Sequence, residues 1–417
     1  MKLLNYILPV AFVSACLMAG CINDNYPVEG DDDLLIGSQT YLMLHIQPLN
    51  ASASRADDNR SEDIKSLRVV MIDDKTDIIE INEKINTGLE ALFSETGYYY
   101  RTAATAGKKR FYIFANEESV TNINGAEEQS LTDLFSKESY NPVKLTDDST
   151  PSSGNGVDFE NEINGVWFQS QYEFESDKIY LPYSTYYAIE LEAGEMYEEP
   201  MFLVPAAIKF DVHLYNYRQE QVRINSVAIE STADRCFLMG NVGTKDYTKN
   251  DVYWVDWLKK VSDDSHSYPE YDENVDFNNL RGWILDYALP QQTLHQPLFL
   301  FSNNSNPTQT DADMTVDEPT GDDKPGYKHL QTTYTHESRA MADQQGYQQY
   351  YLQIKVYDSS IKQYITLSQH LPNVRALFRN THVIINVTMK TGDMDIYAEI
   401  IPWTVGDTVN GFVTEED

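Results

Sequence analysis

Cysteine is scarce in this 417-residue chain, which contains only Cys16, Cys21 and Cys236. Cys16 and Cys21 fall in the N-terminal segment that reads as an export signal. Cys236 alone lies beyond it, so an intramolecular disulfide is excluded in the processed chain. The folded part must therefore rely on the size of its hydrophobic cores. Cys236 itself is expected to be a buried small hydrophobic residue.

Basic residues are also few. The chain has 31 Lys and Arg against 65 Asp and Glu, which gives a net charge of −34. Such a field repels polyanions. We therefore expect no nucleic-acid partner and no binding through charge to an anionic membrane surface.

Sequence motifs of common enzymes are missing. We find no G-x-S-x-G, no H-E-x-x-H and no P-loop, and we expect no enzyme activity, no cofactor and no metal. His329 and His336 stand seven residues apart in a polar stretch, which is poor spacing for a metal site. Residues 303–326 are expected to be a long loop. Its acidic residues lack the spacing of an EF-hand and are expected to be solvated: Asp311, Asp313, Asp317, Asp322 and Asp323.

The N-terminus has the features of a lipoprotein signal. After Lys2, the apolar run 3–13 is too short to span a bilayer. Met18-Ala19-Gly20-Cys21 then precedes a polar, acidic segment, which favours removal of residues 1–20 and a lipid on Cys21. Cys16, after Val13-Ser14-Ala15, is the alternative. Acyl chains on this cysteine would attach the protein to a membrane without a spanning helix.

The segment Tyr41–Leu49 is the first strong strand of the chain. Leu42, Leu44 and Ile46 alternate with other residues and would share one face. Small and polar residues follow up to residue 60 and include Arg55 and Arg60, so this part is expected to be an exposed tether that proteases can cut. The segment is either a removable strand or an ordinary first strand followed by a loop.

Short apolar runs separated by turn residues, together with 29 tyrosines, predict a mostly β protein. The length predicts two domains, with boundaries at 61–200 and 201–417 after a spacer, strand and tether over 21–60. Few helices are expected. Ser130 is a candidate N-cap for a short helix, and Ile78, Ile81 and Ile85 recur at helical spacing.

Several stretches together resemble the fimbrillin-like subunits of type V pili. Besides the lipoprotein signal and Ser54-Arg55-Ala56, the stretches that carry this resemblance are Phe111-Tyr112-Ile113-Phe114-Ala115-Asn116, Leu181-Pro182-Tyr183-Ser184, 202–209, 224–229, 236–239, 378–383 and Ile400-Ile401-Pro402-Trp403. The resemblance implies two β-sandwich-like (transthyretin-like) domains in tandem, no enzyme activity, and a place at the outer membrane and cell surface.

The resemblance also implies an assembly route. An arginine-specific protease would cut after Arg55, or as second choice after Arg60, and remove the strand that carries Leu42, Leu44 and Ile46. A strand from another fimbrial subunit would fill the groove, and the segment after Trp403 would be the donor, with Val405, Val409 and Val413 in phase. That tail is short and also carries Asp407, Asn410 and Gly411, and the basic residue usual near Val204-Pro205 is missing. A stalk, a tip and an anchor subunit therefore all stay open.

A surface lipoprotein that binds glycans is the alternative function. Aromatic side chains would form its platform. The candidates are Tyr98, Tyr99, Tyr100, Tyr186, Tyr187, Trp254 and Trp257. In a β protein such residues more often serve the core or cross-strand pairs.

Overall fold

The computed structural model describes residues 39–48, 63–85, 98–143, 155–169, 180–240, 294–303, 313–320, 324–330, 332–339, 350–371, 376–377, 379–390 and 393–402. All of them belong to one compact unit, Gly37–Asp417. In this part of the chain, no helix is long and apolar enough to cross a membrane.

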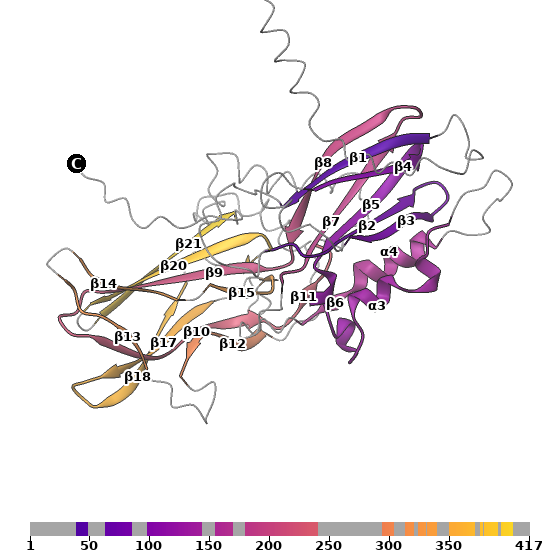
Figure 1. Ribbon diagram of the computed structural model, residues 1–417. Helices are drawn as coiled ribbons and strands as arrows, with labels where there is room; N and C mark the ends of the chain where they lie inside the picture. The colour runs from indigo at the N-terminus through magenta and orange to yellow at the C-terminus, as the bar shows by residue number, and fades with distance from the viewer. Residues whose placement is uncertain are drawn as a thin grey trace, which may run out of the picture. The chain divides into compact units, whose positions relative to one another are not determined.

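The first half of the described chain forms a seven-stranded sheet in the order β3-β2-β5-β7-β8-β1-β4 (Figure 1). Its strands are β1 Gln39–Pro48, β2 Leu67–Asp73, β3 Ile78–Ile85, β4 Tyr98–Thr105, β5 Gly107–Ala115, β7 Tyr183–Leu191 and β8 Met196–Pro205. Between β7 and β8 two residue pairs are in register, Tyr183 with Pro205 and Ser184 with Val204. The sheet folds over at this junction, so that β1 and β4 share one apolar core with β2 and β5.

Strand β2 shows why the sheet has two covered faces. All seven of its residues are buried. Val69 and Met71 point into the core shared with β1, whereas Val70 and Ile72 point into a second core on the other face. Two helices, α3 Leu131–Phe135 and α4 Gly156–Gly165, lie beside this part of the sheet (Figure 1). They contribute Leu134, Phe135 and Phe159 to that second core.

The short helix predicted after Ser130 is confirmed. The Ser130 hydroxyl accepts a hydrogen bond from the Asp133 N–H, and the Asp133 carboxylate accepts one from the Ser130 N–H, which is a capping box. The short strands β6 Trp167–Phe168 and β11 Cys236–Phe237 pair with each other. Three 3-10 turns complete this region, at Glu117–Ser119, Ile123–Gly125 and Glu138–Tyr140.

The second half forms two sheets that enclose a core of their own. The first has the order β12-β10-β17-β18 with β13 beside β10, and the second has the order β14-β9-β20-β21 with β15 beside β9. The strands are β9 Ile208–Asn216, β10 Val222–Ala233, β12 Leu294–Ser302, β13 Met314–Val316, β14 Gly326–His329, β15 Thr333–Thr335, β17 Tyr351–Asp358, β18 Gln363–His370, β20 Thr381–Lys390 and β21 Asp393–Pro402, with β16 Ser338–Arg339 paired to β19 Ala376–Leu377. The prediction of a mostly β chain with two sandwich-like cores and few short helices is confirmed.

Two expectations about local structure are wrong. Residues 78–85 form strand β3, because seven of these eight residues, all except Glu80, pair with β2. A bulge at Glu80 shifts the register by one residue, which gives the isoleucines a spacing that imitates a helix. The loop expected over 303–326 contains β13, which pairs with Val222–Ile224 of β10, and its last residue, Gly326, begins β14.

Cys236 is fully buried, as predicted. Burial raises the pKa of its thiol, so it stays protonated. Its sulfur lies 3.0 Å from Nδ1 of His336.

Candidate functional site

Strand β1 lies inside the sheet, between two strands that are distant in sequence. It runs antiparallel to β4, with Leu44 opposite Tyr100, and parallel to β8, with Leu44 opposite Glu199. Eight residue pairs join β1 to each neighbour. In the order of the described strands, β4 stands at the end of the sheet and has β1 as its partner. Removal of β1 would therefore open a slot with two unpaired rims, β8 and β4.

The inward face of β1 is an integral part of the first core. Leu42, Leu44 and Ile46 are each at most 1% exposed and pack in the cluster that contains residues of β2 and β5. The outward face is different, because Tyr41 is 60% exposed. His45 stacks on Tyr99 of β4 with ring centroids 4.4 Å apart. The alternation predicted from the sequence is confirmed, and the three apolar residues lie together in the core.

The strand that follows β1 in sequence is not its neighbour in the sheet. β2 lies four strands away from β1 in the sheet order. Residues 49–62 connect the two strands and contain Arg55 and Arg60, which lie outside the described residues. Sheet pairing therefore does not bind β1 to the next strand along the chain.

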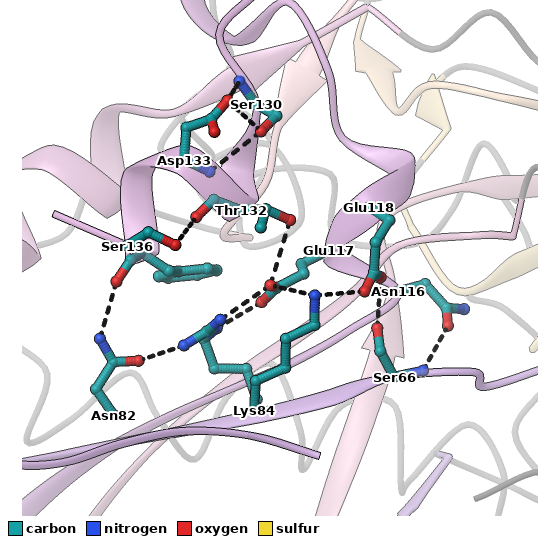
Figure 2. Close-up of polar contacts among 12 residues, drawn as sticks. Ser66, Asn82, Lys84, Asn116, Glu117, Glu118, Ser130, Thr132, Asp133 and Ser136 are labelled. Carbon is teal, nitrogen blue, oxygen red and sulfur yellow. Dashed lines mark hydrogen bonds and ion pairs between the residues drawn. The ribbon is translucent and has the colours of Figure 1, made fainter. Parts of the chain in front are cut away.

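Residues 63–66, which follow residues 49–62 and lead into β2, are held by Asn116. Figure 2 shows the contact between Asn116 and Ser66. The Asn116 side-chain oxygen accepts hydrogen bonds from the N–H groups of Lys65 (2.8 Å) and Ser66 (3.4 Å). Its amide nitrogen donates to the carbonyls of Asp63 and Leu181, both at 2.8 Å. Asn116 is 1% exposed and has a φ of 57°, a conformation that asparagine tolerates better than most residues.

A network of charged side chains also holds residue 66, and Figure 2 shows how these side chains converge. The Ser66 hydroxyl donates to Glu118 at 2.6 Å, and Lys84 bridges Glu118 (2.6 Å) and Glu117 (3.0 Å). Burial opposes ionisation of Glu118, but the hydrogen bonds from Lys84 and Ser66 outweigh it and hold its pKa below the usual value. Glu117 also binds the guanidinium of Arg68 on β2. Residues 63–66, which lead into β2, are thus held in place by side-chain hydrogen bonds.

The remaining assembly residues predicted from the sequence fall outside the described part of the chain. They are Cys16, Cys21, Arg55, Arg60, Val405, Val409 and Val413. Sequence reasoning missed the residues that surround β1 and that hold residues 63–66. The one local signal was Asn116 at the end of the apolar run 111–115, where a small polar residue indicates a turn.

The two histidines considered for a metal site lie apart, and neither is in a polar loop. His329 ends β14, and its Nε2 lies 3.3 Å from Asp211. His336 is fully buried, and burial lowers its pKa to about 3. Across the described ranges, no cluster of three His, Cys, Asp or Glu side chains is arranged to hold a metal. Asp313 and Asp317 accept hydrogen bonds from Asn303 and Gln221, and Asp311, Asp322 and Asp323 are not described.

The aromatic residues considered for a glycan platform have structural contacts. Tyr100 and Tyr187 belong to the first core or pack against it, as does Tyr98. Tyr186 meets Tyr112 at an edge, with centroids 4.9 Å apart. Tyr99 stacks on β1, and Trp254 and Trp257 are not described.

The chain is similar in structure to fimbrial and cell-adhesion proteins, the class that its sequence motifs resemble. One is the tip fimbrial protein Mfa3 from Porphyromonas gingivalis, at 10% identity and a TM-score of 0.47, covering 88% of this chain and 100% of that one. Another is a putative cell adhesion protein from Bacteroides eggerthii, at 11% identity and a TM-score of 0.46, covering 88% and 97%. A third is a fimbrial assembly protein from Parabacteroides distasonis, at 10% identity and a TM-score of 0.37, covering 88% and 99%. No family model and no curated protein matches the chain. Identities near 10% leave the function to be argued from the residues.

Proposed function

We propose that this chain is a structural subunit of a cell-surface fimbria that polymerises by strand exchange. Its first strand, β1, is a placeholder, and cleavage of the connection 49–62 frees it. A strand from another subunit then takes its place. The observation that carries this proposal is the position of β1, which lies within the sheet, fills the core, and is joined to the next strand by a segment with two arginines.

The energetics of the β1 slot suit a strong joint without a disulfide. Burial of one Leu or Ile side chain contributes about 1.5–3 kcal/mol, and β1 buries three of them. A replacement strand would gain the same contacts and would pair with both rims. Because the groove and the donor lie on different parts of the subunit, such a joint does not close on itself and builds a filament.

The proposed processing steps are supported by the N-terminal signal and by the resemblance to fimbrillin-like subunits. Export as a lipoprotein with acyl chains on Cys21, or on Cys16, would hold the precursor at the outer membrane with its slot filled. An arginine-specific protease would then cut after Arg55 or Arg60. The segment with Val405, Val409 and Val413 is the proposed donor for the slot of a neighbouring subunit.

The test compares Arg55→Ala, Arg60→Ala and the double variant with the wild type on the cell surface. N-terminal sequencing and mass determination of the wild type should show a start at Ala56 or Ser61, without β1. The same protein should form ladders in gels that collapse on heating. The double variant should keep β1 and remain monomeric.

Arg218→Ala is the control, because Arg218 lies in the described part of the second half and is distant from the connection in sequence. It should be processed and assembled like the wild type. Normal polymers of the double variant would refute the proposal. Retention of β1 in wild-type polymers would do the same.

A further inference from the structure

Whether the slot keeps its shape after β1 departs depends on whether β4 stays in place. β4 pairs with β1 over eight residues, and the sheet order gives it no other strand among those described. Its backbone is continuous with β5 through Ala106 and Gly107, and Gly107 has a φ of 115° that only glycine adopts readily. When β1 leaves, β4 loses its backbone pairing, and only this turn and the side-chain contacts of β4 can keep this rim of the slot in place.

Side chains of β3 reach β4 from the opposite edge of the sheet. The Tyr100 hydroxyl on β4 donates a hydrogen bond of 2.8 Å to the Glu83 carboxylate on β3. The Thr105 hydroxyl, at the end of β4, donates to Glu80 of β3. β3 and β4 are the two ends of the sheet order, so these bonds close the folded sheet across its open side.

Lys109 strengthens the second of these contacts. Its side chain is completely buried, and its ammonium group donates to Asp73 at 2.6 Å, to Glu80 at 2.8 Å and to Thr105. Hydrogen bonds that involve an ionised partner are stronger than neutral ones. The bulge in β3 falls at Glu80, which is how this carboxylate comes to face β4 instead of following the alternation of the strand.

We infer that the contacts of Tyr100 and Thr105 with Glu83, Glu80 and Lys109 act as a latch that keeps β4 in place while the slot is empty. None of these contacts involves β1, so the departure of β1 removes none of their partners. The latch makes the slot a preformed groove, and a preformed groove accepts a strand faster than one that must first be ordered. This inference rests on the proposed function, because the latch matters only if β1 leaves.

The experiment measures how fast an empty slot takes up a strand. The full chain is cut with an arginine-specific protease, and the N-terminal fragment is removed by gel filtration in mild denaturant. A fluorescent peptide with the sequence of Gln39–Pro48 is then added, and its association and dissociation rates are recorded. The variants are Tyr100→Phe, which keeps the ring against Leu44, and Glu83→Ala. Tyr140→Phe is the matched control, since it removes another tyrosine–glutamate hydrogen bond, to Glu162, outside the latch.

Tyr100→Phe and Glu83→Ala should each lower the association rate about tenfold. The dissociation rate should change less than threefold, because a bound strand holds β4 by itself. The double variant should be no slower than either single variant, as expected for two residues that act as a pair. Arg101 on β4 should also be cut several-fold faster in the emptied variants than in the emptied wild type.

Association rates within twofold of the wild type in both variants would overturn the latch and leave the proposed function standing. If the emptied wild type does not bind the peptide, the strand exchange itself is refuted, and the latch with it. A slowed rate in Tyr140→Phe would also overturn the latch, because the effect would then be general.

Discussion

Strands β1 and β9 occupy the same kind of position and differ in how firmly they are held. Each lies between a parallel and an antiparallel neighbour: β1 between β8 and β4, and β9 between β20 and β14. Each inserts alternate apolar side chains into a core. These are Leu42, Leu44 and Ile46 in β1, and Ile208, Phe210, Val212 and Leu214 in β9.

The two strands differ in their outer faces. Asp211 of β9 is 5% exposed and contacts His382 at 2.6 Å and the Thr332 hydroxyl at 2.6 Å. Two residues, 206 and 207, separate β9 from the preceding strand. β1 instead has an exposed Tyr41 on its outer face and a long connection behind it. Under the proposed strand exchange, an apolar inner face would make a strand fit its slot, while the outer face and the connection would decide whether it can leave.

The largest effect is expected from loss of the Asp211 carboxylate. Asp211→Ala should lower the free energy of unfolding by about 4 kcal/mol, because removing one member of a buried polar pair leaves its partners unsatisfied. Equilibrium unfolding in urea measures this loss. Asp395→Ala, which removes an exposed carboxylate from β21, should cost less than about 0.5 kcal/mol. A similar small cost for both variants would mean that β9 is not fixed by its outer face.

Leu44→Ala should destabilise the uncut protein by about 3 kcal/mol, since it leaves a cavity in the first core. The matched variant Tyr41→Ala on the outer face of β1 should stay within about 0.5 kcal/mol of the wild type. After cleavage and removal of β1, the Leu44→Ala and wild-type proteins should have identical melting curves. A remaining difference would show that β1 had not left.

Asn116→Ala should cost about 2 kcal/mol, from the lost hydrogen bonds to residues 63–66 and the strain of alanine at positive φ. Hydrogen exchange should report faster exchange of the Lys65 and Ser66 amides. Asn116→Gly removes the strain but still lacks the side-chain hydrogen bonds. The amides of Lys65 and Ser66 should therefore also exchange fast in this variant. Protection of both amides in Asn116→Gly would contradict the proposed anchor.

The smallest effect is a dependence on pH in the second half of the chain. Burial, and then the neighbouring His329, lower the pKa of His213 on β9 to about 4. Between pH 6.5 and 4 the unfolded chain binds a proton at His213 that the folded chain does not, so stability falls as the pH falls through this window. With allowance for partial solvation, the change is about 1 kcal/mol.

The matched variant for this effect is His213→Gln. Unfolding curves at pH 6.5, 5.5 and 4.5 should show a shallower decline in the variant than in the wild type. Equal slopes would mean that folding does not lower the pKa of His213. β1 should be unaffected by this change, since His213 lies on β9.

Short-range patterns predicted the strands, the helix after Ser130 and the inward face of β1, because alternation and capping depend on residues a few positions apart. The isoleucines of β3 misled the same reasoning, because one bulged residue at Glu80 breaks the period of two. The loop expected over 303–326 failed because the short strand β13 takes its stability from pairing with β10, not from its own composition.

The position of β1 in the sheet could not be predicted from the sequence, for a different reason. Its parallel partner β8 is separated from it by about 150 residues, and nothing in either segment marks the other. The contacts of Glu80, Glu83 and Tyr100 join side chains that only the folding-over of the sheet brings together. Asn116 was visible as a residue that ends a strand, but its four hydrogen-bonding partners lie at positions 63–66 and 181.

The position of β1 between one parallel and one antiparallel neighbour also gives the proposed fibre a direction. A replacement strand that keeps the orientation of β1 would run parallel to β8 and antiparallel to β4. Every joint would then have the same sense. The two extremities of the fibre would differ chemically, one with a vacant groove and the other with an unused donor strand. Elongation would proceed by different events at each extremity, and a single subunit without a donor strand would be enough to end it.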